Sequence, residues 1–248
     1  MQHALCIVPI APIRKQAAHE SEMTSQLVFG ESCILHERTG NGFYRITCEH
    51  DGYEGFCMGN QLLILEESWH DDHPHLGAWS NAVHSPDGSV MQVPFGATAP
   101  PQLTALFKPA DHTSISSTLS FNEDNLKMIT SLFINTPYLW GGRTVFGADC
   151  SGFVQMTMKA MGISLPRDAS QQVLKGREIL LDDARAGDLA FFDVDGRIVH
   201  VGILLSNSEI MHAFGKVRKD GIDDKGIINR ETGERTHSLK VVKTLVDS

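Results

Sequence analysis

Residues 149–153 read DCSGF, residues 198–204 read IVHVGIL and residues 209–214 read EIMHAF. The first stretch opens a predicted helix that runs from about Cys150 to Met161 and ends at Gly162, a residue type that favours the left-handed C-terminal cap. The other two stretches are predicted to be consecutive strands. These three segments decide the fold of the C-terminal half and place one thiol near two imidazoles.

Cys150 lies in the first turn of the predicted helix, directly after Asp149, a favoured N-cap residue. The unpaired backbone N–H groups and the positive end of the helix dipole stabilise a thiolate at such a position. The alternative is a buried structural cysteine, because free cysteines are commonly buried. Position alone favours that structural interpretation.

The register of the two strands decides whether His200 and His212 meet. A two-residue turn at residues 207–208 places them on opposite faces, because side chains alternate along a strand. A three-residue loop at residues 206–208 instead places Gly202 opposite His212, with His200 as a diagonal neighbour about 7–8 Å away by Cα. A lone histidine in an apolar strand is more often a core residue. With the second register, however, His200 is a general base for a thiol and His212 orients it, as nucleophilic catalysis requires.

The sequence pattern of the first half of the chain is typical of small all-β modules. Short apolar segments alternate with turns rich in Gly, Asn, Asp and Pro; they lie at residues 27–29, 32–36, 42–48, 55–58, 78–84 and 89–93. We predict one β module over residues 1–66, a second over residues 67–118, and an α+β domain over residues 119–248. A helix at residues 123–135, capped by Asn122 or Ser120, opens that domain, and a strand at residues 241–246 closes its sheet.

Composition limits the class of protein. The chain has 248 residues and a formal net charge of -9, which argues against a broad nucleic-acid surface. No apolar run reaches the about 20 residues of a membrane helix. The apolar run at residues 4–13 has no basic segment before it, so we expect an edge strand and an extended segment there, not a signal peptide. Five cysteines, an odd number, favour reduced thiols in the cytoplasm.

Five motifs of the C-terminal half resemble, in order, the NlpC family of papain-like cysteine peptidases. They are YLWGG at residues 138–142, DCSGF at 149–153, LPRD at 165–168, AGDL at 186–189 and HVGI at 200–203. Upstream, SEMTSQL at residues 21–27 and DGYEGF at 51–56 resemble the paired bacterial SH3-like barrels of one subfamily, the γ-D-glutamyl-L-diamino acid endopeptidases. The resemblance implies an α+β chain in which two small all-β SH3-like barrels precede a papain-like NlpC domain.

The same resemblance implies hydrolysis of the γ-D-glutamyl–diamino acid bond in short muropeptides with a free N-terminal L-Ala, in cell-wall peptide recycling. It assigns catalysis to Cys150, His200 and His212. The positions that match substrate-binding residues are Glu22, Tyr53, Asp149, Ser151, Arg167 and Asp168. Carboxylates and a phenol oxygen suit an ammonium group, since all are acceptors. The expected partner is the muropeptide, with no cofactor, metal, nucleic acid or membrane.

Other interpretations of these residues stay open. The scaffold also suits a thiol amidase or acyltransferase, or a non-catalytic protein that binds wall peptides. Glu22 is then a solvated charge, Tyr53 packs in the barrel, and Asp168 caps the segment at residues 169–172. Residues 70–75 (HDDHPH) contain metal-ligand residue types, but their spacing matches no zinc motif and Pro74 predicts a loop.

Overall fold

The computed structural model describes residues 2–66, 75–110, 115–116 and 118–246. The chain forms two compact units, one of Met1–Leu119 with Trp140–Phe146 and one of Ser120–Leu139 with Gly147–Ser248. The predicted loop at residues 70–75 lies outside the described residues except for His75. Within the described part of the chain, no helix combines the length and apolarity that a membrane span needs.

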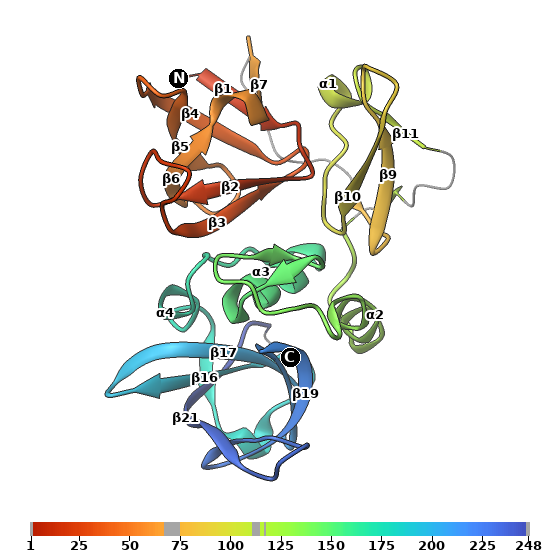
Figure 1. The fold of residues 1–248 in the computed structure, drawn as a ribbon. Coiled ribbons are helices and arrows are strands. Elements are labelled where there is room, and N and C mark those ends of the chain that lie inside the picture. The colour runs from red at the N-terminus through yellow and green to blue at the C-terminus, as the bar shows by residue number, and fades with distance from the viewer. Residues whose placement is uncertain (1, 67–74, 111–114, 117, 247–248) are drawn as a thin grey trace. The chain divides into compact units, whose positions relative to one another are not determined.

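The first unit contains an antiparallel sheet in the order β3-β2-β6-β5-β4-β1-β7, coloured red to orange in Figure 1. Its strands are β1 (Gln2–Cys6), β2 (Ile10–Arg14), β3 (Met23–Val28), β4 (Ser32–Arg38), β5 (Phe43–Cys48), β6 (Glu54–Met58) and β7 (Leu62–Leu65). Each strand predicted between residues 27 and 58 is present. Four free cysteines belong to its buried core: Cys6, Cys33, Cys48 and Cys57.

The N-terminal apolar run forms two strands, and the prediction of an edge strand is wrong. β1 lies between β4 and β7, and β2 lies between β3 and β6. Proline is normally excluded from inner strands because it lacks a backbone N–H. Pro12 fits in β2 because β2 pairs with β6 at Arg14 alone, so no β6 residue lies opposite the proline.

A smaller sheet in the order β10-β9-β11 follows in the same unit. It consists of β9 (Ser80–His84), β10 (Val90–Pro94) and β11 (Lys108–Pro109), with α1 (Pro101–Thr104) beside it and a short pair of β8 (His75–Leu76) with β12 (Ile115–Ser116). Leu5 and Phe29 of the first module share one buried cluster with Val83 and Val93. The two predicted β modules therefore share a core, and their boundary at residues 66 and 67 stays a prediction.

The second unit builds a closed sheet in the order β15-β21-β16-β17-β18-β19-β20, in which β21 also pairs with β20 (Figure 1, cyan to blue). Its strands are β15 (Arg177–Ile179), β16 (Leu189–Val194), β17 (Arg197–Ser206), β18 (Glu209–Phe214), β19 (Lys216–Asp223), β20 (Gly226–Ile228) and β21 (Arg235–Thr244). The short strand β14 (Gly147–Ala148) lies outside this sheet. The predicted closing strand is confirmed as β21, although it begins earlier than expected. β19 and β20 were not predicted.

The two predicted helices of this unit begin where the sequence predicts, and each ends slightly earlier than expected. α2 (Glu123–Phe133) is capped by Asn122, whose side chain accepts a hydrogen bond from the Asn125 amide. α3 (Cys150–Ala160) is capped by Asp149, and Gly162 follows it with a φ of +77°. α4 (Ala169–Gln172) is a single turn. The caps satisfy the N–H groups that a helix start leaves unpaired, so the end of α3 that carries Cys150 is fixed in place.

Candidate active site

The thiol of Cys150 is buried where α3 meets β17. Asp149 Oδ1 accepts a hydrogen bond of 2.8 Å from the Gly152 amide and so holds the first turn of the helix. Burial raises the pKa of the Cys150 thiol to about 11, and the charge of Asp149 adds to this rise, while the backbone N–H groups of Val201 and Ser151 oppose it. Burial therefore raises the pKa of the thiol more than the backbone N–H groups at the helix N-terminus lower it, and the resting thiol is protonated. Val201 directly follows His200, so the thiol lies beside that part of β17.

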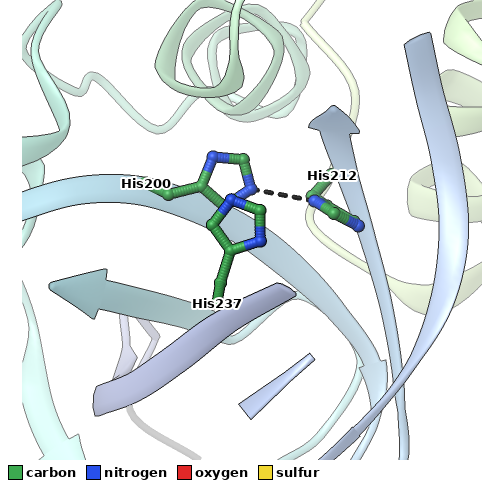
Figure 2. A group of neighbouring side chains, drawn as sticks. All are labelled: His200, His212 and His237. Carbon is green, nitrogen blue, oxygen red and sulfur yellow. Dashed lines mark hydrogen bonds between the residues drawn. The ribbon is translucent and has the colours of Figure 1, made fainter. Parts of the chain in front are cut away.

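Of the two registers that the sequence left open for β17 and β18, the structure has the one that places both histidines on one face, although the turn is not the expected three-residue loop. Gly202 lies opposite His212, but Ser206 pairs with Glu209 across a two-residue turn. A bulge between Leu204 and Ser206 then shifts the register by one residue. Nε2 of His200 lies 2.8 Å from Nδ1 of His212 (Figure 2). The two imidazoles thus share one face of the sheet.

Gly202 makes room for this pair. A Cβ atom at residue 202 would lie 2.9 Å from the Cβ of His212 and 2.7 Å from Cδ1 of Ile210. Distances below 3.0 Å are essentially never seen for real Cβ atoms. A side chain at this position would therefore displace His212 from its contact with His200.

Sequence reasoning missed Asp220, which lies on the unpredicted strand β19. Arg218 faces His212 across β18 and β19, and Asp220 is the next residue on the same face. Oδ2 of Asp220 lies 3.0 Å from Nε2 of His212, and both side chains are fully buried. Burial raises the pKa of Asp220, but hydrogen bonds from His212, the Arg230 amide and Arg218 outweigh burial and bring the pKa to about 2. Asp220 is therefore an ionised carboxylate at neutral pH.

This chain of contacts assigns the protons of both histidines. An ionised carboxylate only accepts hydrogen bonds, so Nε2 of His212 donates to Asp220. With Nε2 as its donor, His212 accepts at Nδ1, and Nε2 of His200 donates to it. Burial lowers the pKa of His200 well below its usual value, and the neighbouring His212 and His237 lower it further. Neutral His200 consequently keeps its lone pair on Nδ1, the atom able to take a proton.

His237 is a second residue that sequence reasoning missed, because the predicted last strand began only at residue 241. Its ring stacks on His200 with centroids 4.2 Å apart and an angle of 20° between the planes. Burial, with a contribution from His212, lowers the pKa of His237 to about 4. Nitrogen atoms of His200, His212 and His237 all lie within 4.8 Å of one another (Figure 2).

Three predicted substrate-binding residues form a buried cluster around the start of α3. Arg167 donates to Asp149 Oδ1 at 3.0 Å, to Asp149 Oδ2 at 2.5 Å and to the Ser151 hydroxyl at 2.8 Å. Gln172 donates to the backbone oxygen of Ser151 at 3.0 Å. These contacts tie α3 to α4, and the substrate contacts of the three residues stay a prediction. Asp168 is half-buried, and its side chain does not cap α4.

Glu22 and Tyr53, the other two predicted substrate-binding residues, belong to the first unit. The Glu22 carboxylate is 43% exposed and accepts from Trp140 Nε1 at 2.9 Å and from Lys15 Nζ at 3.4 Å. Tyr53 is half-buried against the core of the first sheet. Glu22 therefore combines an exposed carboxylate with an aromatic neighbour, as recognition of a cation requires.

Arg143, on β13 (Arg143–Thr144), carries no predicted role and is fully buried in the first unit. Its guanidinium donates to Glu31 at 2.9 Å and 3.2 Å, to the backbone oxygen of Gln26 at 2.7 Å and to His50 Nε2 at 2.8 Å. Glu31 is fully buried as well. This ion pair fixes the segment Trp140–Phe146, which carries the indole bound to Glu22.

Two segments of the chain match known families. Residues 135–236 match the NlpC/P60 family, and residues 13–62 match the bacterial dipeptidyl-peptidase Sh3 domain. The predicted resemblance to the NlpC family and to bacterial SH3-like domains is confirmed, whereas the second SH3-like barrel at residues 67–118 and the domain boundaries stay predictions. The chain is similar to the gamma-D-glutamyl-L-lysine dipeptidyl-peptidase of Bacillus subtilis, with 45% identity over 86 residues, or 34% of this chain and 29% of that protein.

Further relatives agree with this assignment. The probable endopeptidase NlpC of Escherichia coli is 43% identical over 81 residues, which cover 32% of this chain and 53% of that protein. The aligned part spans less than a third of the length of the Bacillus subtilis relative and of its Bacillus cereus counterpart. The crystal structure of an NlpC/P60 family protein from Bacillus cereus has a TM-score of 0.79 at 16% identity and covers 99% of this chain and 100% of its own. That likeness confirms the predicted fold class.

Proposed function

Because residues 135–236 form an NlpC/P60 domain, we propose that this protein is a cysteine endopeptidase that cleaves the γ-D-glutamyl–diamino acid bond of short muropeptides. The observation that carries the proposal is the buried relay Asp220–His212–His200, which leaves a lone pair on Nδ1 of His200. Val201, the next residue of β17, hydrogen-bonds the Cys150 thiol through its backbone N–H. Relatives named gamma-D-glutamyl-L-lysine dipeptidyl-peptidase support the choice of bond.

The reaction begins from a neutral thiol and a neutral imidazole. As Sγ of Cys150 attacks the carbonyl carbon, Nδ1 of His200 takes the thiol proton, and the positive charge that forms on the ring is stabilised through His212 by the Asp220 carboxylate. Nδ1 then gives the proton to the leaving amine, which frees the diamino acid. Water, deprotonated by the same nitrogen, hydrolyses the thioester and restores Cys150.

Recognition of the free amino terminus falls to acceptor groups. The L-Ala ammonium is a donor only, so carboxylates such as Glu22 and Asp168 and the Tyr53 phenol oxygen are suitable partners. An N-acylated muropeptide has no such charge and cannot donate the charge-assisted hydrogen bonds that these acceptors would take from the ammonium. A substrate with a free end is therefore favoured, which suits the recycling of short wall fragments. The five free cysteines support a reducing, cytoplasmic location for that role.

The test compares L-Ala-γ-D-Glu-diaminopimelate with its N-acetylated form, by chromatographic quantification of released diaminopimelate. We expect rapid hydrolysis of the free form and a loss of about 10- to 10²-fold in kcat/KM for the acetylated form, the scale of a lost hydrogen bond to a charged group. Equal turnover of both forms would contradict end recognition, and full activity of Cys150→Ala would contradict the mechanism. The L-Lys analogue defines the diamino acid preference.

Glu22→Gln separates the peptidase from a thiol amidase or acyltransferase. Only the peptidase is expected to lose activity, through a raised KM for the free-amine substrate. Glu54→Gln is the matched control, because Glu54 is an exposed carboxylate of the same unit that pairs with Arg45 at 3.5 Å. If both variants retain the original KM, Glu22 does not bind the substrate.

A further inference from the structure

Three imidazoles converge beside the thiol, although the proton relay uses two. His200, His212 and His237 come from β17, β18 and β21 and each places a ring nitrogen within 4.8 Å of the others (Figure 2). His237 lies outside the relay, since its Nδ1 contacts the Thr236 hydroxyl at 2.9 Å. Three histidine nitrogens with one open position are the donor set of many zinc sites.

The surroundings favour a metal ion over a purely structural cluster. The Asp220 carboxylate holds Nε2 of His212 at 3.0 Å and so aims Nδ1 into the cluster, as a carboxylate does behind many metal-bound histidines. The charged groups nearest to His212 are Asp220 and Arg218, which pair with each other. The charge of Asp220 is thus balanced by Arg218, while its carboxylate orients the His212 ring.

We propose that His200, His212 and His237 bind a divalent transition-metal ion of the zinc type, and that the bound ion inhibits the peptidase by occupying His200. The inhibition, though not the binding, rests on the proposed function. Imidazole favours zinc, cobalt and nickel over magnesium and calcium. The ligand is thus a borderline-soft ion that is absent during turnover.

The ion acts through the tautomer of His200. Nε2 of His200 and Nδ1 of His212 are 2.8 Å apart, and bonds of about 2.0–2.1 Å to one tetrahedral zinc need them about 3.3 Å apart. A small ring movement therefore replaces the hydrogen bond with two metal bonds. His200 loses its proton from Nε2 and gains one on Nδ1, so the ring stays neutral with no net proton exchange. Nδ1 then has no lone pair for the thiol, and the base is lost without any change at Cys150.

The binding test uses the full chain with Cys150→Ala, so that no thiolate of the site contributes. Co²⁺ absorption and Zn²⁺ calorimetry are compared between this protein and the same protein with His237→Phe, which keeps an aromatic ring over His200. We expect binding with a 1:1 ratio and at least a tenfold weaker affinity after His237→Phe. His84→Phe is the matched control, because His84 is an exposed histidine of β9. No binding at millimolar metal, or equal affinity with His237→Phe, overturns the proposed site.

The inhibition test uses the intact thiol and divides each rate with Zn²⁺ by the same variant's rate in EDTA. Zn²⁺ should inhibit the wild type reversibly, while Mg²⁺ and Ca²⁺ should not, and His237→Phe should raise the inhibitory Zn²⁺ concentration at least tenfold. Equal sensitivity of both proteins means that zinc acts elsewhere, for example at Cys150 alone, and overturns the inhibition. If the EDTA-treated enzyme cleaves no muropeptide, the proposed function fails, and the binding test still decides the metal site.

Discussion

Nε2 of His200 lies 2.8 Å from Nδ1 of His212, and Gly202, on the strand of His200 and opposite His212, leaves room for that contact. The opposite nitrogen of His212 faces the Asp220 carboxylate at 3.0 Å. Each group fixes the proton of the next, so a carboxylate far from the thiol decides which nitrogen of His200 is the base. The relay therefore depends on hydrogen-bond polarity as much as on distance.

Asp220→Asn tests that polarity. An amide can donate to Nε2 of His212, which moves the His212 proton to Nδ1 and leaves Nε2 of His200 as an acceptor. His200 then carries its proton on Nδ1 and cannot take one from the thiol. We expect kcat to fall by up to about 10⁴-fold, the cost of a wrong histidine tautomer in a serine protease, with little change in KM.

The matched control is Asp223→Asn, on the same strand. Asp223 is part-exposed and pairs with Arg235, away from the relay. We expect it to retain kcat within about twofold, since exposed ion pairs contribute little. Circular dichroism of both variants establishes that they are folded. A kcat for Asp220→Asn equal to that of Asp223→Asn would rule out the tautomer argument.

Gly202→Ala tests the space for the pair. The added methyl would meet the Cβ of His212 at 2.9 Å and Cδ1 of Ile210 at 2.7 Å. Because His212 is fully buried, it has to move away from His200, and overpacking of this kind costs about 1–3 kcal/mol. We expect kcat to fall by at least about tenfold, measured in the muropeptide assay.

Gly221→Ala controls for the general effect of alanine in this sheet. A Cβ at residue 221 meets nothing closer than 3.6 Å, which is an ordinary contact. This variant should keep wild-type kcat and unfold at a similar urea concentration. Equal kcat for Gly202→Ala and wild type would show that the close approach is not needed for catalysis.

Local patterns were enough to predict the elements that carry the thiol. Asp149 and Gly162 mark the ends of α3 in the sequence, and both act there through their own backbone or side chain. The sequence left two registers for His200 and His212, and only one of them places both side chains on one face. The bulge that produces this register was not predictable, since it depends on how β17 packs against its neighbours.

The remaining parts of the site depend on strand pairing and tertiary contacts, which no local sequence pattern indicates. Asp220 lies on a strand rich in charge, so its alternation did not stand out as a half-buried strand. His237 precedes the apolar end of β21 and is placed by closure of the sheet through β20. The sequence alone gives Arg143 no partner and so suggests a surface cation, but in the structure it pairs with Glu31. None of these contacts follows from a local rule.

The buried pair of Arg143 and Glu31 makes a stability prediction. Both side chains are fully buried, so Arg143→Met leaves a carboxylate without its cation. We expect the free energy of unfolding to fall by about 3–5 kcal/mol, and the double variant Arg143→Met, Glu31→Leu to recover most of the loss. Urea unfolding, followed by fluorescence, measures both.

Arg45→Met is the control for that experiment. Arg45 and Glu54 are partly exposed and 3.5 Å apart, and such pairs contribute about 0–1 kcal/mol. If Arg143→Met lowers the free energy of unfolding no more than Arg45→Met does, the pair of Arg143 and Glu31 is not buried in solution.

The pH profile tests the neutral thiol–imidazole pair. Burial, with His212 and His237, lowers the pKa of His200 below its usual value, so more acid than usual is needed to protonate it. Burial raises the pKa of the Cys150 thiol to about 11, so the thiol keeps its proton through neutral pH. Since kcat/KM reports the free enzyme, its acid limb should have a midpoint below the ordinary histidine value of about 6.5. The same shift makes the folded state bind fewer protons than the unfolded chain below that pH, so the unfolding free energy also falls there. Circular dichroism at each pH therefore restricts the fit to folded enzyme, and a midpoint at or above 6.5 would contradict a neutral, buried His200.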